Sequence, residues 1–291
     1  MTQEKIYPVA KISDYGYRDF SQLKKVQHIV IRIIVGLLIL SLYIPVIMLA
    51  IQSVNSVDNA LSIDFGHVTL KWYTTMFEND KLTDAIIVTL ITSGISTMLS
   101  VVIGTLAAIG LYSFEKKRRQ KFMLLNNIPI LNADIVTGIS VMMVATLILK
   151  PIIPTIFGLP TLIIAHLFFS IPYVILNVMP KLKEMDPNLM DAALDLGVKP
   201  YRALYKVIVP AITAGIFSGM LLAFTMSIDD FVISLFNSGS ISNLSKWVYA
   251  QYKRSPTQRV SAFSTLLTVM TIVFMLIYGL INNIKKRRNE K

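Results

Sequence analysis

Six long apolar runs constrain the fold of this chain more than any other feature. Each is about 20 residues or longer and nearly free of charge. They are Ile33 to Ile51, Ala85 to Phe114, Phe122 to Leu149 (interrupted only by Asp134), a run starting near Pro160 within Pro151 to Pro180, Val207 to Ile228, and Val260 to Ile284. A helix of about 20 residues crosses the roughly 30 Å of hydrocarbon in a bilayer. The sequence therefore predicts an all-α integral membrane protein with six transmembrane helices.

Composition supports a membrane location and excludes several other classes. Charged residues make up only 15% of the chain, against about 25% in soluble domains. The net charge of +11 would suggest nucleic acid in a soluble domain, but here it reflects basic loops, so we expect no nucleic-acid partner. There is no cysteine, and the three histidines lack ligand spacing, so no metal site is expected.

Lysine and arginine are concentrated in the loops on one side of the predicted spans. Counting Arg32, that side holds 21 of the 28 basic residues, and the rest of these 21 lie in the N-terminal arm, Glu115–Lys121, Lys181–Lys206 and the tail after Ile284. Cytoplasmic loops are enriched in basic residues, so both termini of this multi-pass membrane protein are predicted to be cytoplasmic. We divide the chain into a cytoplasmic arm, residues 1–27, and a six-helix transmembrane domain, residues 28–291.

Two predicted spans carry small residues at four-residue spacing. The second has Ser96, Ser100, Gly104 and Ala108, and the fifth has Ala211, Gly215, Gly219 and Ala223. Small residues let helix backbones approach closely in a membrane, so both stripes are predicted to be packing faces.

The cytoplasmic loop between spans four and five, residues 184–206, has the features of a short helix followed by a turn. Asp186 can cap that helix, Pro187 suits its first position and Gly197 suits the left-handed residue after its end. Pro200 can begin a second helix that leads to a kink at Pro210. One apolar face is predicted, made of Leu189, Ala192, Ala193 and Leu196. Such a rigid projection is suited to docking a cytoplasmic partner.

This loop resembles the "EAA" coupling motif of ABC importer permeases. The motif reads Glu-Ala-Ala, three residues, Gly, nine residues and Ile-x-Leu-Pro. Here Asp191, Ala192 and Ala193 are followed by Gly197 and by Val207-Ile208-Val209-Pro210 at the same spacing, with Asp in place of Glu. The resemblance implies that Asp191, Ala192, Ala193, Gly197 and Pro210 couple the chain to an ATPase.

Roughly Trp72 to Ile284 resembles the C-type membrane subunit of spermidine/putrescine importers. The resemblance is clearest at Phe224–Ser234, which contains Ser-x-Asp-Asp-Phe-Val-Ile-Ser, and at Asn132–Ser140. It implies a polyamine as cargo and a location in the bacterial cell membrane. It also implies three kinds of partner: a dimer of ATP-binding subunits, a second permease subunit and an extracytoplasmic substrate-binding protein.

Carboxylates near the membrane are the candidate substrate-path residues. Asp134 lies within the third run, and Asp229 and Asp230 close the fifth. Carboxylates there would offset the dehydration of a polycation, and Phe231 could add cation–π attraction. Alternatively, Asp229 or Asp230 caps the following helix, and Asp134 bonds a neighbouring span. For His166 we expect a structural hydrogen bond rather than a proton relay.

Other functions remain open at this stage. The same machinery could carry an amino acid, a sugar, a phosphonate or a metal. An ion-coupled secondary carrier would need more buried charge, and a membrane enzyme would need clustered catalytic residues. The chain has no Gly-x4-Gly-Lys-Ser/Thr phosphate loop. We therefore expect it to be non-catalytic and to hold no cofactor of its own, with ATP bound by partner subunits.

Overall fold

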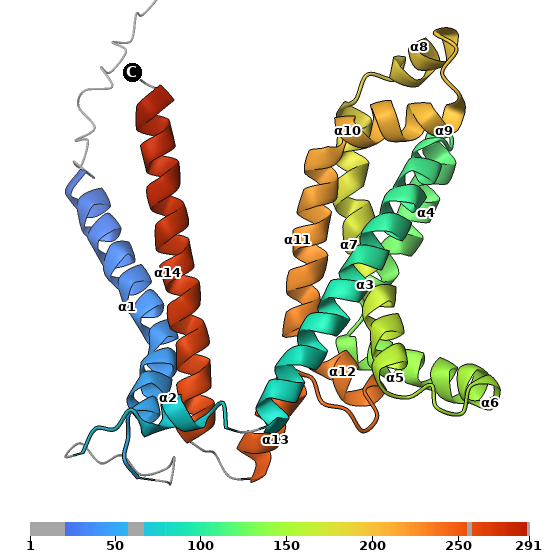
Figure 1. Cartoon of the computed structure of the whole chain (residues 1–291). Coiled ribbons are helices and arrows are strands. Elements are labelled where there is room, and N and C mark those ends of the chain that lie inside the picture. Colours follow the sequence, from blue (N-terminus) through green and yellow to red (C-terminus); the bar gives the residue numbers. More distant parts are fainter. Residues whose placement is uncertain (1–20, 58–66, 79, 255–257, 290–291) are drawn as a thin grey trace, which may run out of the picture.

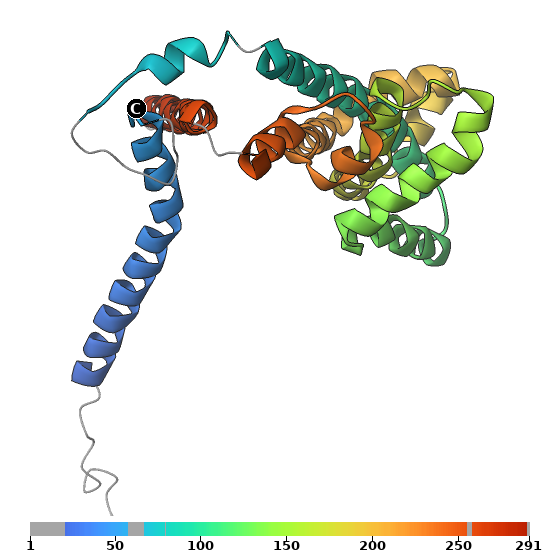
Figure 2. The same cartoon turned by 90° about the horizontal axis from the view of Figure 1, so that it is seen from below.

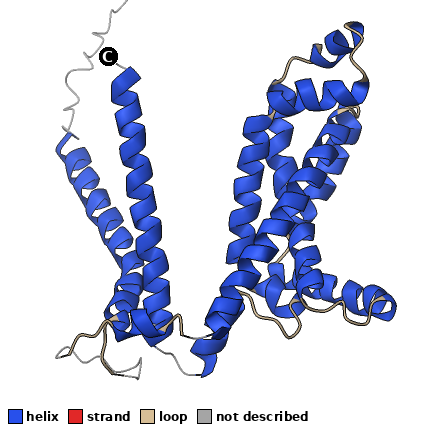
Figure 3. Cartoon of the chain, in the orientation of Figure 1, coloured by secondary structure: helices blue, strands red, loops and turns tan. Residues whose placement is uncertain are grey.

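The computed structural model describes residues 21–57, 67–78, 80–254 and 258–289. Most of the predicted N-terminal arm, residues 1–20, lies outside these ranges. Helices make up nearly all of the described chain (Figure 3), and its β-structure is one isolated bridge between Asn55 and Val68. The all-α prediction is confirmed.

Within the described residues, five helical segments are long and apolar enough to cross a membrane. They are α1 (Ser21–Ser53), α3 (Asp80–Tyr112), the continuous segment α5 (Asp134–Val144), η2 (Ala145–Leu149) and α6 (Lys150–Ile152), α7 (Leu159–Glu184), and α14 (Gln258–Asn289). A bent pair, Pro200–Ala211 and Thr213–Asp229, makes a sixth if its two parts form one span. Six spans and cytoplasmic termini stay predictions.

The third predicted span is not one uninterrupted helix. The run from Phe122 to Leu149 contains the end of α4 (Lys116–Leu131), a break at Asn132 and Ala133, and then α5 and η2. Asn132 and Ala133 adopt extended backbone with ψ of 147° and 135°. Asp134 consequently stands in the first turn of α5, where a carboxylate interacts favourably with the helix dipole. This predicted span is therefore corrected to two helices that meet at Asp134.

The centre of the fold is a bundle of α3, α7 and α11 (Thr213–Asp229), shown in Figures 1 and 2. Both small-residue stripes pack against α7. A Cβ on Gly104 would lie 2.8 Å from Val174 Cβ, and one on Gly219 would lie 3.1 Å from Val174 Cα. The predicted packing faces are confirmed, except that Ala211, at the end of its stripe, is exposed. Only glycine permits so close an approach.

Helices α1 and α14 pair with each other and stand apart from this bundle (Figure 1). Beside them, α2 (Lys71–Thr75) and α13 (Leu244–Arg254) contribute Trp72 and Trp247 to one apolar cluster with Phe263 of α14. Nearly all described side chains of α1 before its last turn are exposed, and Figure 2 shows this helix leaning away from the rest. Its surface is therefore available to lipid or to another subunit.

The two ends of the molecule differ in character. Helix α8 (Leu189–Asp195) lies at the end where α14 finishes, and α2, α12 (Val232–Asn237) and α13 lie at the opposite end (Figure 1). This arrangement agrees with the predicted sidedness, in which α8 is cytoplasmic.

Candidate functional site

The coupling loop contains the predicted helix and its glycine stop. Helix α8 ends in a Schellman motif: the Gly197 N–H donates to the Leu194 carbonyl at 2.8 Å, and the Val198 N–H donates to the Ala193 carbonyl at 3.1 Å. Gly197 has φ of 76°, in the left-handed region that the prediction required. The chain therefore reverses sharply after Asp195.

The start of α8 and its apolar face differ from the prediction. The helix begins at Leu189, so Pro187 lies outside it, and Asp186 instead accepts a hydrogen bond from the Asn188 N–H at 2.9 Å. Ala193 is buried, whereas Leu196 is 84% exposed. The predicted face is divided because α8 packs against η3 (Leu204–Ile208) on one side only. That contact buries Ala193 and leaves Leu196 outside it. Asp191 and Ala192 are exposed, so they are accessible to a partner.

After Gly197 the chain forms a second helical segment, which ends at a sharp bend. Helix α9 (Pro200–Ala203), η3 and α10 (Val209–Ala211) run together as one segment, which meets α11 at an angle of 73°. Pro210 stands two residues before Ile212, where the bend lies, and the Thr213 hydroxyl donates to the Pro210 carbonyl. Ile212, at the corner, is fully buried. The predicted second helix and the kink at Pro210 are thus present.

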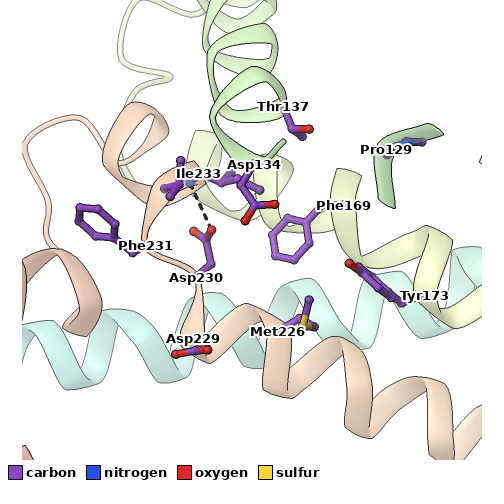
Figure 4. Close-up of a pocket in the computed structure, with 11 residues that line it drawn as sticks. Pro129, Asp134, Thr137, Phe169, Tyr173, Met226, Asp229, Asp230, Phe231 and Ile233 are labelled. Atoms are coloured by element: carbon purple, nitrogen blue, oxygen red, sulfur yellow. Dashed lines mark hydrogen bonds between the residues drawn. The ribbon is translucent and has the colours of Figure 1, made fainter. Parts of the chain in front are cut away.

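A pocket of about 210 Å³ lies at the far end of α11 and contains all four predicted substrate-path residues. Figure 4 shows this carboxylate pocket, where α4, α5, α7, α11 and α12 meet. It is lined by Pro129, Asp134, Thr137, Phe169, Tyr173, Met226, Asp229, Asp230, Phe231, Val232 and Ile233. Within the described part of the chain, no group of three His, Cys, Asp or Glu is placed to hold a metal ion.

The three carboxylates of the pocket have different surroundings. Asp134 and Asp229 are exposed side chains from α5 and α11. Asp230 is 7% exposed, and its carboxylate accepts hydrogen bonds from the Ile233 N–H at 3.2 Å and the Ser234 N–H at 2.7 Å. Asp230 therefore caps α12, which was the alternative role considered for it. Asp134 and Asp229 are the carboxylates available to a cation.

Aromatic side chains from α7 also line the pocket, and the sequence reasoning missed them. Phe169 is buried and Tyr173 is half-buried, one turn apart on the same face of the helix. Phe231, which was predicted to line the path, packs its ring on Tyr249 with centroids 4.6 Å apart. In Figure 4 that ring points away from Phe169 and Tyr173. The four-residue spacing of two aromatics on α7 was the signal available in the sequence.

A buried polar network supports the pocket from behind. His166 Nδ1 shares a hydrogen bond of 2.5 Å with the Ser227 hydroxyl, and Nε2 lies 3.0 Å from the Ser234 hydroxyl. The Ser227 hydroxyl also shares a hydrogen bond of 3.2 Å with the Ser96 hydroxyl of α3. The hydrogen bond expected of His166 is present, and its ring joins α7 to α11 and α12.

The loop after α12 is held by a lysine. Lys246 Nζ donates to the Ser238 hydroxyl at 2.6 Å and to the carbonyls of Gly239 and Ile241, both at 3.0 Å. Partial burial lowers the pKa of Lys246. Asn243 Nδ2 donates to the Ser234 hydroxyl at 2.8 Å, which links this loop to the network around His166.

Comparison with known proteins gives consistent results for sequence and fold. Residues 100–291 match the family described as binding-protein-dependent transport system inner membrane component. The spermidine/putrescine transport system permease protein PotC of Escherichia coli (strain K12) is 31% identical over 249 residues, which cover 85% of this chain and 92% of that protein. The putrescine transport system permease protein PotI of the same strain is 30% identical over 251 residues, covering 85% and 89%.

Solved structures share the fold at low sequence identity. A bacterial ABC transporter for alginate import has a TM-score of 0.63 at 13% identity, with 95% of this chain and 99% of that chain covered. The MetNI methionine ABC transporter has a TM-score of 0.55 at 17% identity, with 68% and 92% covered. The family model, the full-length relatives and the coupling loop agree: this chain belongs to the family of inner membrane components of binding-protein-dependent transport systems.

Proposed function

We propose that this chain forms the translocation path of an ATP-driven polyamine importer together with a second permease subunit. The observation that carries the proposal is the carboxylate pocket, where Asp134 and Asp229 are exposed beside Phe169 and Tyr173. The names of the full-length relatives PotC and PotI point to the same cargo.

The chemistry of the pocket suits a protonated polyamine better than a neutral or anionic solute. Each ammonium group loses hydration on entering the pocket, and an exposed carboxylate offsets that loss. Aromatic faces attract the same cations and also contact the methylene segments between them. Two carboxylates would repel a phosphonate, and they could accept hydrogen bonds from a sugar but would add no charge attraction, so the exposed charges favour a cationic cargo.

Energy reaches the pocket through the coupling loop. An ATPase dimer would bind α8 through its exposed side, and a substrate-binding protein would deliver the cargo at the end that carries α12 and α13. Closure of the ATPases would move α8 and the Pro200–Ala211 segment as a lever. Because that segment meets α11 at 73°, its rotation would tilt α11 and shift Asp229 at the other end.

Uptake of labelled spermidine and putrescine by cells that express the complete transporter tests this proposal. The double variant Asp134→Asn/Asp229→Asn removes both exposed carboxylates and preserves their shapes. We expect uptake to fall about tenfold or more, with normal complex assembly and basal ATP hydrolysis, because roughly 1.4 kcal/mol of lost attraction is a tenfold effect. Asp80→Asn is the matched control, since Asp80 is exposed near the same end but outside the pocket. Parental uptake in the double variant would contradict the proposal.

A further inference from the structure

A second cavity, of about 570 Å³, lies where α4 begins beside the end of α7. Figure 1 shows this region at the end of the molecule that carries α8 and α9, opposite the carboxylate pocket. The cavity is lined by Lys116, Arg119, Gln120, Met123, Leu124, Asn127 and Lys183. This cavity shares no lining residue with the carboxylate pocket and has no part in the proposed transport function.

Three cations from two helices converge on this basic cavity. The Arg119 guanidinium is held in place, because Nη1 donates to the Tyr112 carbonyl at 3.2 Å and the group stacks over the Tyr112 ring at 5.4 Å. Lys116 and Lys183 form no ion pair with any other residue that the structure describes. The acidic Glu184 nearby is engaged by Lys181 at 2.7 Å. The cavity therefore offers an excess of positive charge to an anion.

An exposed apolar stripe continues directly from the basic cavity along α4. Leu124, Ile128 and Leu131 follow Lys116 and Gln120 at intervals of three or four residues, so they share one face of the helix. Their exposed fractions are 69%, 58% and 85%. One face of α4 thus changes from cationic to apolar within about two turns, as the surface of a membrane protein does at the level of the lipid headgroups.

We propose that this face of α4 binds an anionic phospholipid. The phosphate diester would accept hydrogen bonds from Lys116, Arg119 and Lys183, and an acyl chain would lie along Leu124, Ile128 and Leu131. Arginine and lysine are the usual partners of phosphate oxygens, and the guanidinium fork can bind two of them. A bound lipid would bridge the start of α4 and the end of α7, one residue before the coupling loop. The proposal is independent of the identity of the transported solute.

Native mass spectrometry of the purified full-length chain tests the proposal. The chain is mixed with phosphatidylglycerol or phosphatidylcholine, and the lipid retained is compared between two variants. Lys116→Gln/Lys183→Gln removes two cavity cations and leaves the anchored Arg119 in place. Lys117→Gln/Lys121→Gln is the matched control, since both residues are exposed on α4, outside the cavity, and the net charge changes equally. We expect the cavity variant to lose roughly tenfold or more in affinity for phosphatidylglycerol and the control to lose little.

Three outcomes would overturn the proposal. Equal loss in both variants would mean that only the general positive charge of this surface attracts the lipid. Displacement of phosphatidylglycerol by inorganic phosphate at equal concentration would assign the cavity to a free anion, because the acyl chain would then contribute nothing. Exclusion of phosphatidylglycerol when the chain is assembled with the second permease subunit would assign this face of α4 to that subunit. Retention of the lipid in the assembly, with loss only in the cavity variant, supports the site.

Discussion

The imidazole of His166 and the hydroxyl of Ser227 share a hydrogen bond of 2.5 Å that ties α7 to the last turn of α11. The other ring nitrogen of His166 lies 3.0 Å from the Ser234 hydroxyl and 3.5 Å from the Asp230 carboxylate. All of these groups are buried. The carboxylate pocket is therefore built on a polar support that fixes three helices relative to one another.

We expect His166→Ala to destabilise the chain more than an ordinary substitution. Removal of the ring breaks its hydrogen bonds to the Ser227 and Ser234 hydroxyls, each worth about 1 kcal/mol, and leaves a cavity where α7, α11 and α12 meet. The apparent melting temperature of the purified chain in detergent should fall. Ser140→Ala is the control, because Ser140 is exposed on α5 and bonds only within its own helix. An unchanged melting temperature in His166→Ala would contradict the supporting role of the network.

Asp230 is expected to act through α12 rather than through charge. Asp230→Ala removes the cap of that helix, at a cost of about 1 kcal/mol, whereas Asp230→Asn still offers an oxygen to the Ser234 N–H. Polyamine uptake and thermal stability should therefore fall together in the alanine variant and recover largely in the asparagine variant. If Asp230→Asn lowers uptake as strongly as Asp229→Asn with no loss of stability, Asp230 contributes to the path by its charge.

Gly197→Val should uncouple ATP hydrolysis from transport. Gly197 has φ of 76°, which a β-branched residue resists, and a Cβ there would meet no atom within 4 Å. Any loss of coupling would therefore come from the changed backbone at residue 197, which would displace α8, and not from a steric clash of the new side chain. Gly197→Asn should retain much of the function, because asparagine tolerates left-handed backbone.

The measurement for Gly197 is ATP hydrolysis stimulated by the substrate-binding protein in the purified complex. Gly110→Val serves as its control, since Gly110 lies near the same end of the molecule in ordinary helical backbone with open space around it. If Gly197→Val shows full stimulation of ATP hydrolysis, the left-handed backbone at Gly197 has no role in coupling.

Gly219→Leu should force α11 away from α7. A Cβ on Gly219 would already lie 3.1 Å from Val174 Cα, a backbone atom that cannot move independently of its helix. Overpacking of this kind typically costs about 1–3 kcal/mol. We expect lower yield of folded protein and a lower melting temperature. The same change at Gly94, which has open space around it on α3, should be tolerated; comparable losses in the two variants would contradict the packing argument.

The predicted sidedness can be tested by single cysteines, since the chain contains none. Ser56→Cys and Ser240→Cys should react in intact cells with a thiol reagent that cannot cross the membrane. Gln120→Cys and Asn188→Cys should react only after the cells are opened. All four positions are exposed, so accessibility depends on the side of the membrane alone. Labelling of Asn188→Cys in intact cells would reverse the topology and exclude the coupling loop from the cytoplasm.

Features of the structure that depend on neighbouring residues in the chain could be predicted from the sequence. The apolar runs marked the long helices, although α1 begins well before Ile33, the third run is divided at Asn132 and the fifth is bent at Ile212. Gly197 and Pro200 marked the end of one short helix and the start of another, and the small-residue stripes marked the faces that meet α7. Helix length, turn geometry and helix periodicity arise from local backbone and side-chain preferences, which the order of residues states directly.

The roles of the pocket residues depended on partners that are distant in the sequence. The sequence placed Asp229 and Asp230 side by side as equivalent candidates. Only the packing of α7 and α12 made Asp230 a buried cap near His166 and left Asp229 exposed. Asp134 joined them because the chain breaks at Asn132, and Phe169 and Tyr173 entered the pocket because that face of α7 turns toward α5. Which side chains meet is decided by how helices pack, and the sequence of each helix alone does not specify that arrangement.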